Sequence, residues 1–287
     1  MLVEKSNFTI KRMARLLEVS RSGFYAWCTR KPSPRAVRAE RIEAKIAWFH
    51  GESDEVFGSP RILADLRADG EIISRKTVAK TMRKLRLRGI CPKQWKTTTI
   101  TKKTDTYPGD AAKRAWDTGV LNRIWVGDIT YLRTWQGWLY LATVIDAHSR
   151  RVIGWAIDDH MRTDLVEDAL RMAIVLRGEL PEQVVFHTDR GTQGTSADYR
   201  ALVITLGMRS SMGATGVCWD NSLAESFFAA LKNERVHRTV YPTKARCRVD
   251  VIAYIEGFYN ARRRHSALNY HTPNDVHYSH RTTASAA

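Results

Sequence analysis

Three acidic residues in the second half of the sequence occupy positions where acidic side chains are unusual. Asp128 interrupts the apolar, β-branched run IWVGDITYL, and Asp189 ends a second run, VVFHTD, just before a turn at Gly191. A charged side chain within a core strand is costly to bury unless another group pairs with it. Glu225 follows the loop TGVCWDN and lies near the start of a segment with helical periodicity. Taken singly, each acid can also be explained as a cap, a turn residue or an ion-pair partner.

If the three carboxylates converge in space, the chemistry open to them is metal-assisted phosphoryl transfer. Mg²⁺ and Mn²⁺ prefer carboxylate oxygens as ligands. Two such ions about 3.5–4 Å apart can activate an attacking oxygen and stabilise the leaving one. The elements that carry Asp128, Asp189 and Glu225 must then meet at one patch of the fold.

From residue 124 onward the sequence alternates between strand and helix patterns. Three closely spaced strands are predicted at 124–134, 137–149 and 151–159, a spacing typical of an antiparallel meander. The elements predicted after them are a helix (163–177), a strand (184–189), a helix (196–206), a strand (208–212) and helices at 221–236 and 243–262. This order resembles a ribonuclease H-like α/β domain, with a mixed five-stranded sheet flanked by helices. In that arrangement the strands of Asp128 and Asp189 lie side by side, and the helix of the third acid crosses them.

The first 90 residues predict small all-α regions instead. Residues 8–27 form two short helices with a turn before Ser20, which can cap the second helix. This layout is typical of a helix-turn-helix, and Arg21 and Tyr25 are then candidate DNA contacts on its second helix. A purely structural helical hairpin explains the same pattern.

A second helical region occupies about residues 31–90. An amphipathic helix at 37–49 precedes two helices that Ser59 and Ser74 can cap. The buried side of the last helix comprises Val78, Met82 and Leu85. Its opposite side is basic and is a candidate DNA-binding face, with Arg75, Lys76, Lys80, Arg83 and Lys84. A basic helix face can equally be a surface that only contacts solvent.

The charge distribution indicates a nucleic-acid partner. The 287-residue chain carries 46 Lys and Arg against 30 Asp and Glu, a net charge of +16. Residues 1–120 contribute +13 of this, and the segment 91–120, rich in Lys and Thr, predicts an extended basic linker. Contacts from Lys and Arg to phosphate supply most of the non-specific affinity for nucleic acid. A basic surface that only maintains solubility is the alternative.

Composition and patterning exclude several classes of protein. No apolar run approaches the roughly 18 residues of a membrane span, and charges interrupt the N-terminus where a signal peptide needs an apolar stretch. The four cysteines form no C-x-x-C pair, which argues against a zinc site and against a disulfide framework. We therefore expect a cytoplasmic protein.

The spacing of the three acids and the segments around them point to one family. Sixty residues separate Asp128 from Asp189, and 35 separate Asp189 from Glu225. The chain from about residue 8 to 278 resembles the integrase-core half (the OrfB portion) of insertion-sequence transposases of the IS-three type. The segments that carry the resemblance are GSPRI, WVGDITYLRTWQGWLYLATVIDAHSRRVIGWA, VFHTDRGTQ, CWDNSLAESFFAALKNE and FYNARRRHSALNYHTP. The resemblance implies a DNA transposase with a D, D-35-E catalytic core.

The resemblance also implies roles for individual residues. Asp128, Asp189 and Glu225 become the catalytic residues and the ligands of Mg²⁺ or Mn²⁺, with two ions per site. Lys232, two helical turns after Glu225, becomes a DNA contact, although a solvent-facing lysine fits the same position. A C-terminal phosphate clamp is predicted from the run Arg262, Arg263 and Arg264, unless these bases only complement the dipole of a helix.

Three further residues near the triad are expected to support it. Asn221 is interpreted first as the N-cap of the helix that carries the third acid. His187, in the strand before the second acid, is either a buried structural histidine or a contact to DNA. Asp146 follows a strand and can cap it or pair with Arg150 or Arg151.

The sequence departs from the family pattern at three positions. Gly127 precedes the first acid where the family usually has Thr or Ser, Gly194 stands where an aromatic residue is common, and Trp219 replaces a Tyr. No carboxylate is lost, so we expect the chemistry to survive.

The chain is thus predicted to have five segments. These are a helix-turn-helix (1–30), a second basic helical region (31–90), a basic linker (91–120), the catalytic core (121–240) and a basic C-terminal helix with a tail (241–287). The expected partners are double-stranded DNA (terminal repeats and target), a second copy of the chain, and an upstream OrfA-type product. The alternatives are a metal-dependent nuclease of the same fold and a DNA-binding regulator with an inactive core. The expected location is the bacterial cytoplasm and nucleoid.

Overall fold

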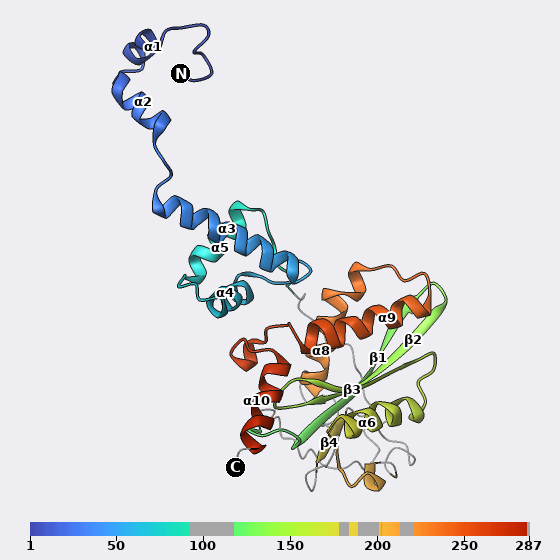
Figure 1. The fold of residues 1–287 in the computed structure, drawn as a ribbon. Coiled ribbons are helices and arrows are strands. Elements are labelled where there is room, and N and C mark those ends of the chain that lie inside the picture. Colours follow the sequence, from blue (N-terminus) through green and yellow to red (C-terminus); the bar gives the residue numbers. More distant parts are fainter. Residues whose placement is uncertain (92–117, 178–183, 189–200, 202, 213–220, 286–287) are drawn as a thin grey trace.

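The computed structural model describes residues 1–91, 118–177, 184–188, 201, 203–212 and 221–285. Its centre is a five-stranded sheet with the strand order β3-β2-β1-β4-β5 (Figure 1). The strands are β1 (Ile124–Thr134), β2 (Gly137–Asp146), β3 (Val152–Asp158), β4 (Val185–Thr188) and β5 (Arg209–Met212). The mixed α/β sheet expected from the sequence is confirmed.

The central strand β1 has different neighbours along its length. β1, β2 and β3 form an antiparallel meander, whereas β4 runs parallel to β1 and β5 runs parallel to β4. β4 pairs with β1 only from Ile124 to Gly127. Beyond Gly127, and within the described residues, β2 is the only strand paired with β1. Asp128 is the first residue of the part of β1 that pairs with β2 alone among the described strands.

Helices cover both faces of the sheet. On one face, α6 (Thr163–Arg177) packs on β2 and β3 through side chains that include Leu165 and Leu170. On the other, α8 (Ser222–Glu234) and α9 (Lys244–Ala253) pack against β1, and α9 also contacts β2. Each face has its own apolar cluster. Figure 1 shows α6 on one side of the strands and α8 with α9 on the other.

The second helical region contains three helices, α3 (Pro34–Glu52), α4 (Ser59–Ala68) and α5 (Arg75–Lys84). Ser74 caps α5 as predicted, and its Oγ accepts a hydrogen bond from the Thr77 N–H at 3.2 Å. The predicted cap at Ser59 is wrong, because Gly58 occupies the N-cap position and Ser59 is already helical. Pro60, in the first turn, has no N–H group, so this helix start has one donor fewer to satisfy.

The α3–α5 region packs directly on the C-terminal half of the chain. Its buried residues Ile46, Leu66 and Val78 belong to the same apolar cluster as residues of α8 and α9. The ring centroids of Phe57 and Phe258 are 6.0 Å apart. The basic helices and the helix that carries the third acid are therefore parts of one packed unit.

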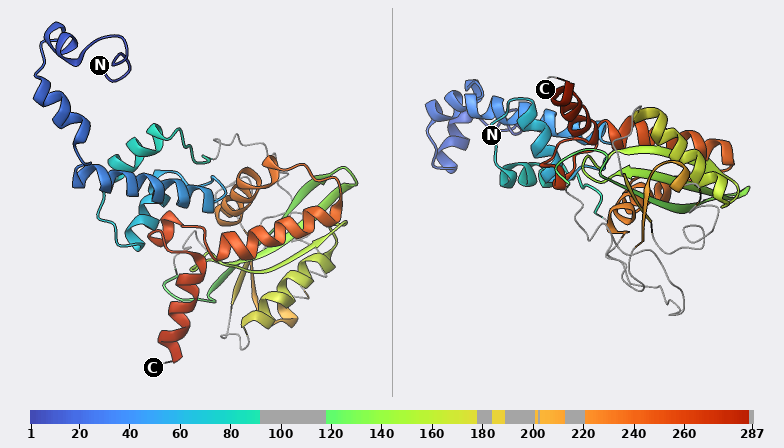
Figure 2. Two further views of the ribbon diagram at one scale, coloured as in Figure 1. Left: turned by 45° about the horizontal axis from the view of Figure 1, so that its top comes forward. Right: turned by 90° about the horizontal axis from the view of Figure 1, so that it is seen from below.

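The N-terminal hairpin consists of α1 (Ile10–Leu16) and α2 (Arg21–Thr29), in agreement with the two helices predicted. Ser20 caps α2, and its Oγ accepts a hydrogen bond from the Gly23 N–H at 2.9 Å. The hairpin has a small core: three residues of α1 are buried, and none of α2. Figures 1 and 2 show it apart from the rest of the protein.

The C-terminal segment differs from the single helix predicted at 243–262. α9 ends at Ala253, and the chain continues as a π-helix from Tyr254 to Asn260. A further helix, α10 (Pro273–Ser285), has no counterpart among the predicted elements. Among the helices that the structure describes, none is long and apolar enough to cross a membrane.

Gly127 has a structural reason to differ from the family pattern. A Cβ atom on this residue would lie 2.3 Å from Cζ of Phe186 and 3.3 Å from Cγ2 of Thr188. Phe186 is fully buried in β4, so its ring has little freedom to move aside. This core therefore leaves no space for Thr or Ser beside Asp128.

Gly127→Ala is expected to lower the free energy of unfolding by about 1–3 kcal/mol, because the added methyl group overpacks the Phe186 ring. Gly51→Ala in α3 is the matched control, since nothing lies within 4 Å of a Cβ atom there. The control should be neutral or stabilising by up to about 1 kcal/mol, because alanine is the better helix former. Urea unfolding measures both variants, and equal free energies of unfolding would contradict the crowding argument.

Candidate active site

Asp128 lies on β1 next to the end of β4. Gly127, the residue before it, pairs with Thr188 of β4, and Asp128 itself pairs with Thr143 of β2. The Asp128 side chain is half-buried, and its Oδ1 accepts a hydrogen bond from the Ile129 N–H at 2.7 Å. Asp189 follows Thr188 directly in the chain, but it lies outside the described residues, as do Gly194 and Trp219. The described part of the predicted triad therefore consists of Asp128 and Glu225.

Glu225 is exposed in the first turn of α8, the helix that packs on β1. Asn221 occupies the N-cap position of α8, as predicted, but its side chain makes no capping hydrogen bond. Asn221 is buried, and neither Oδ1 nor Nδ2 has a hydrogen-bond partner within the part of the chain that the structure describes. Glu225 therefore lies on the side of the sheet where α8 packs against β1. No side-chain hydrogen bond from Asn221 caps the start of this helix.

Lys232 lies in the last turn of α8 and reaches the strand of Asp128. Its Nζ lies 4.9 Å from the ring centroid of Tyr131. Burial lowers the pKa of Lys232, and the negative charge of Asp128 acts in the opposite direction. Lys232 is therefore a half-buried cation beside Asp128 rather than a side chain that extends freely into solvent.

Asp146 holds a turn in place. Its Oδ1 accepts hydrogen bonds from the N–H and Oγ of Ser149, both at 2.8 Å, and its Oδ2 lies 3.1 Å from Nη2 of Arg177. The capping role predicted for Asp146 agrees with these bonds. The ion-pair partner is Arg177 of α6, however, and not Arg150 or Arg151. Asp146 is fully buried, so we interpret it as structural.

His187 bridges two strands. It is fully buried in β4, and its Nδ1 lies 3.0 Å from Oγ of Ser211 in β5. Of the two roles that the sequence left open, this position favours the structural one.

All three arginines of the basic run 262–264 pair with carboxylates of the protein, although Arg262 stays exposed. Arg263 is buried and donates to both carboxylate oxygens of Glu234 in α8, with its Nη2 at 2.7 Å from Oε1. Arg264 Nε donates to Asp65 Oδ1 at 2.8 Å, and Arg262 pairs with Glu52. A phosphate clamp cannot include a guanidinium that is buried against its own carboxylate, so Arg263 is corrected to a structural residue. The sequence contains no local signal for this pairing.

Glu234 is the buried centre of this contact. Tyr254 donates a hydrogen bond from its hydroxyl to Glu234 Oε2 at 2.7 Å, and Nη1 of Arg61 in α4 lies 3.7 Å from Oε1. Burial, together with the charges of Arg263 and Arg61, lowers the pKa of the neighbouring His265, which favours its neutral form. Glu234 thus joins the end of α8 to α4 and to the C-terminal segment.

The remaining predicted DNA contacts are at the surface. Arg21 and Tyr25 are exposed on α2. On α5 the exposed basic residues are Arg75, Lys76, Lys80, Arg83 and Lys84. Lys84, at the end of α5, pairs with Glu43 of α3.

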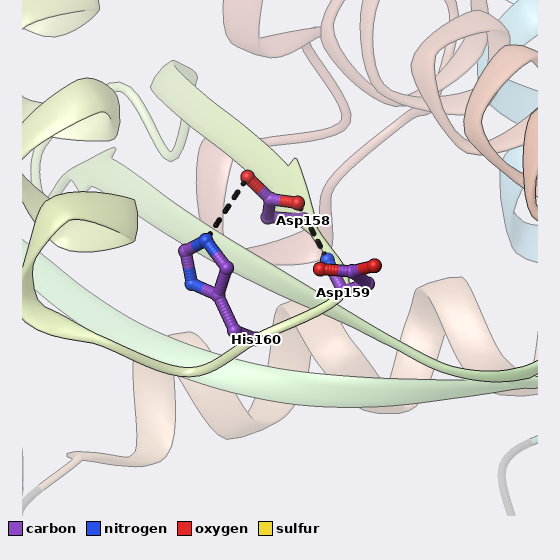
Figure 3. A group of neighbouring side chains, drawn as sticks. All are labelled: Asp158, Asp159 and His160. Carbon is purple, nitrogen blue, oxygen red and sulfur yellow. Dashed lines mark hydrogen bonds and ion pairs between the residues drawn. The ribbon is translucent and has the colours of Figure 1, made fainter.

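A second group of candidate metal ligands lies at the end of β3. Ligand atoms of Asp158, Asp159 and His160 all lie within 4.8 Å of one another (Figure 3). Two cations of α9 neutralise the acids: Arg248 Nη2 lies 3.5 Å from Asp158 Oδ1, and Lys244 Nζ lies 3.4 Å from Asp159 Oδ2. We therefore interpret this group as a link between β3 and α9.

Comparisons with known proteins match both the second helical region and the segment that contains the sheet. A family model described as an HTH-like domain matches residues 38–95, and two models described as integrase core domain match residues 121–218 and 206–273. The transposase InsF for insertion sequence IS3A of Escherichia coli (strain K12) is 39% identical over 264 residues, which cover 91% of each chain. An uncharacterized 31 kDa protein of insertion element IS600 from Shigella sonnei is 33% identical, over 91% of this chain and 96% of its own.

Solved structures of integrase cores are more distant. The catalytic core domain of BIV integrase is 16% identical, with a TM-score of 0.41, over 57% of this chain and 98% of that chain. The dimeric form of the HTLV-2 integrase catalytic core domain in complex with magnesium is 18% identical, with a TM-score of 0.38, over 50% of this chain and 89% of that chain. The high identity along almost the whole InsF chain identifies the family: this chain belongs to the IS3-type insertion-sequence transposases, DNA transposases with a DDE-type integrase core.

Proposed function

We propose that this transposase cuts and joins DNA strands at the ends of its element with Asp128, Asp189 and Glu225 as catalytic residues. The observation that carries the proposal is the packing of α8 against β1. One helix carries Glu225 in its first turn and Lys232 in its last, and the charge of Asp128 on β1 acts on Lys232. Two acidic side chains that could hold a divalent cation, with a partly buried lysine beside them, suit the binding of a phosphodiester.

Enzymes with an integrase core are metal-dependent. The donor set of this site fits a hard cation, because carboxylate oxygens come from two packed elements and Asp128 is only half-buried. We propose that Asp128, Asp189 and Glu225 hold Mg²⁺ or Mn²⁺, with two ions per site. When bound, such ions polarise the scissile phosphate and make an attacking hydroxyl more acidic.

The proposed reaction consists of two in-line displacements at phosphorus. In the first, a water oxygen bonds to phosphorus, the 3′ oxygen of the element end leaves, and the proton lost by water is balanced by the proton that the 3′-OH gains. In the second, that 3′ oxygen loses its proton and bonds to a phosphorus atom of the target strand, whose own 3′ oxygen leaves and takes up a proton, so that one hydroxyl is consumed and one is released. Lys232 would hold the phosphate by a charge-assisted hydrogen bond while the acids act on the reacting oxygens.

The proposed partners are the terminal repeats and the target as double-stranded DNA. Joining two ends requires at least two copies of the chain on DNA, and an upstream OrfA-type product is proposed as a further partner. The proposed location is the bacterial cytoplasm and nucleoid.

The test uses a labelled duplex with the element end, the purified chain and Mg²⁺ or Mn²⁺. A strand joined to a second duplex by the wild type, and lost in Glu225→Gln, supports the proposal. Glu167→Gln on α6, an acid paired with Arg171, is the matched control and should retain the product. Shortened strands without joined product would indicate a nuclease. Binding without cleavage, even after the OrfA-type product is added, would indicate a DNA-binding regulator.

Removing the exposed charges of α5 is expected to weaken DNA binding in a salt-dependent way. Each phosphate contact that is lost should reduce the slope of log affinity against log salt by about 0.9. The double variant Lys76→Gln with Lys80→Gln tests this by fluorescence anisotropy at several salt concentrations. Lys45→Gln is the control, because Lys45 is paired with Asp69 and Glu71. Equal slopes for wild type and double variant would remove α5 from the DNA interface.

A further inference from the structure

The outer end of the β1–β2 hairpin carries large aromatic side chains that remain exposed. Tyr131 of β1 is 59% exposed and Trp138 of β2 is 46% exposed. Their ring centroids are 5.3 Å apart, with the planes at 90°. Such an edge-to-face pair is a preferred aromatic geometry, so the two rings form a defined surface rather than two independent side chains.

The register of the hairpin explains why these rings share a face. Tyr131 pairs with Tyr140, and Arg133 pairs with Trp138, so all four side chains project from the same side of the sheet. Tyr140 is partly buried against the apolar cluster that α6 covers. Tyr131, Arg133 and Trp138 lie further out and are exposed.

This aromatic surface is connected to the candidate active site. Lys232 Nζ lies 4.9 Å from the ring centroid of Tyr131, within the range of a cation–π contact. Tyr131 follows Asp128 by three residues, about 10 Å along β1, so the two side chains project from opposite faces of the sheet. Lys232 lies close to both of them, beyond Gly127, where the described part of β4 no longer pairs with β1. A DNA strand that crosses this edge of β1 with a phosphate at Lys232 would therefore have neighbouring nucleotides within reach of the two rings.

We propose that Tyr131 and Trp138 stack on unpaired DNA bases next to the scissile phosphate, while Lys232 and Arg133 contact the strand's phosphates. Aromatic rings beside cations are the common means of binding single-stranded nucleic acid without sequence readout. The inference rests on the proposed function, and it adds that the DNA end is locally unpaired in the complex. Protein–protein interfaces also favour Tyr, Trp and Arg, although they are depleted in lysine. The contact of Tyr131 with Lys232, on the helix that carries Glu225, is what favours DNA as the occupant.

The test compares two duplexes with the element end, one fully paired and one with three unpaired terminal nucleotides that include 2-aminopurine. Tyr131→Ala and Trp138→Ala should each weaken binding of the unpaired end by about 5-fold or more, with loss of 2-aminopurine quenching. Binding of the fully paired end should change far less. Tyr131→Phe keeps the ring and should behave like the wild type. Trp48→Ala removes an exposed tryptophan of α3 and is the control outside the hairpin.

The possible results separate this inference from the function on which it rests. Unchanged quenching in both alanine variants, or equal losses on the two duplexes, would overturn the stacking proposal while the transposase reaction stands. The stacking proposal would also be overturned if Tyr131→Ala retained quenching but changed its oligomeric state in the absence of DNA. Sedimentation would detect that change. A wild-type protein that neither binds nor cleaves either duplex would contradict the proposed function itself.

Discussion

Asp128→Asn is expected to lower the rates of strand cleavage and strand transfer by at least about 1,000-fold. The substitution keeps the shape of the side chain but removes the charge that would hold a divalent cation. Loss of such an ion forfeits several kcal/mol of transition-state stabilisation, and each 1.36 kcal/mol corresponds to about tenfold in rate. Single-turnover assays on a labelled element end measure the two rates separately.

The structure supplies a matched control for this prediction. Asp159→Asn makes the same change in the acidic group at the end of β3, where Lys244 is the partner of Asp159. Exposed ion pairs of this kind contribute little, so its rates should stay within about threefold of the wild type. Circular dichroism and DNA affinity should remain unchanged in both variants. Full activity of Asp128→Asn would exclude Asp128 from the catalytic residues.

Glu234→Ala is expected to reduce the free energy of unfolding by about 3–5 kcal/mol, because it leaves a buried guanidinium without a compensating charge. The side chains of Glu234 and Arg263 are 1% and 9% exposed. The same substitution removes the acceptor of the Tyr254 hydroxyl and the charge next to Arg61. Urea unfolding with the wild type and the variant under identical conditions measures the loss.

The exposed ion pair of Glu43 and Lys84 gives a reference for the loss of stability in Glu234→Ala. Glu43→Ala breaks the contact with Lys84, whose side chain is 66% exposed, and should cost no more than about 1 kcal/mol. The double variant Glu234→Leu with Arg263→Met should recover much of the stability lost in Glu234→Ala, because it removes both charges of the buried Glu234–Arg263 pair together. If Glu234→Ala is no more destabilising than Glu43→Ala, the buried pair does not hold this part of the fold together.

The position of Glu234 also predicts a functional consequence of the loss. Glu234 ends the helix that carries Glu225 and Lys232, and it is tied to Arg61 of the HTH-like domain. A looser helix end should reduce strand transfer more than DNA binding, since the basic face of α5 is unaffected. Comparing the two measurements in Glu234→Ala separates a positioning effect from general unfolding.

The local elements could be predicted from the sequence because their signals are local. Alternating and helical periodicity gave the bounds of β1 and α6 as the structure has them. Ser20 and Ser74 cap their helices as predicted, because a side-chain acceptor only has to reach an N–H three residues away. The family resemblance and its candidate triad rest likewise on motifs and spacings along the chain.

The residues whose roles the sequence did not predict have partners that are distant in the chain. The basic run 262–264 is ambiguous in the sequence, since arginine suits phosphate and carboxylate equally well. Arg263 finds Glu234, 29 residues earlier, and Arg264 finds Asp65, 199 residues earlier. The ion-pair partner of Asp146 is Arg177, 31 residues later, and not Arg150 or Arg151. These pairings depend on which elements the folded chain brings together.

Motifs and periodicity were thus sufficient for the family, the sheet and the candidate acids. Tertiary packing decided which charges remain available to DNA: it buried Arg263 and left the basic face of α5 exposed. It also decided that Gly127 must lack a side chain beside Phe186. The physical reason is that desolvation and crowding depend on every element that surrounds a residue, whereas a sequence pattern records only the neighbours along the chain.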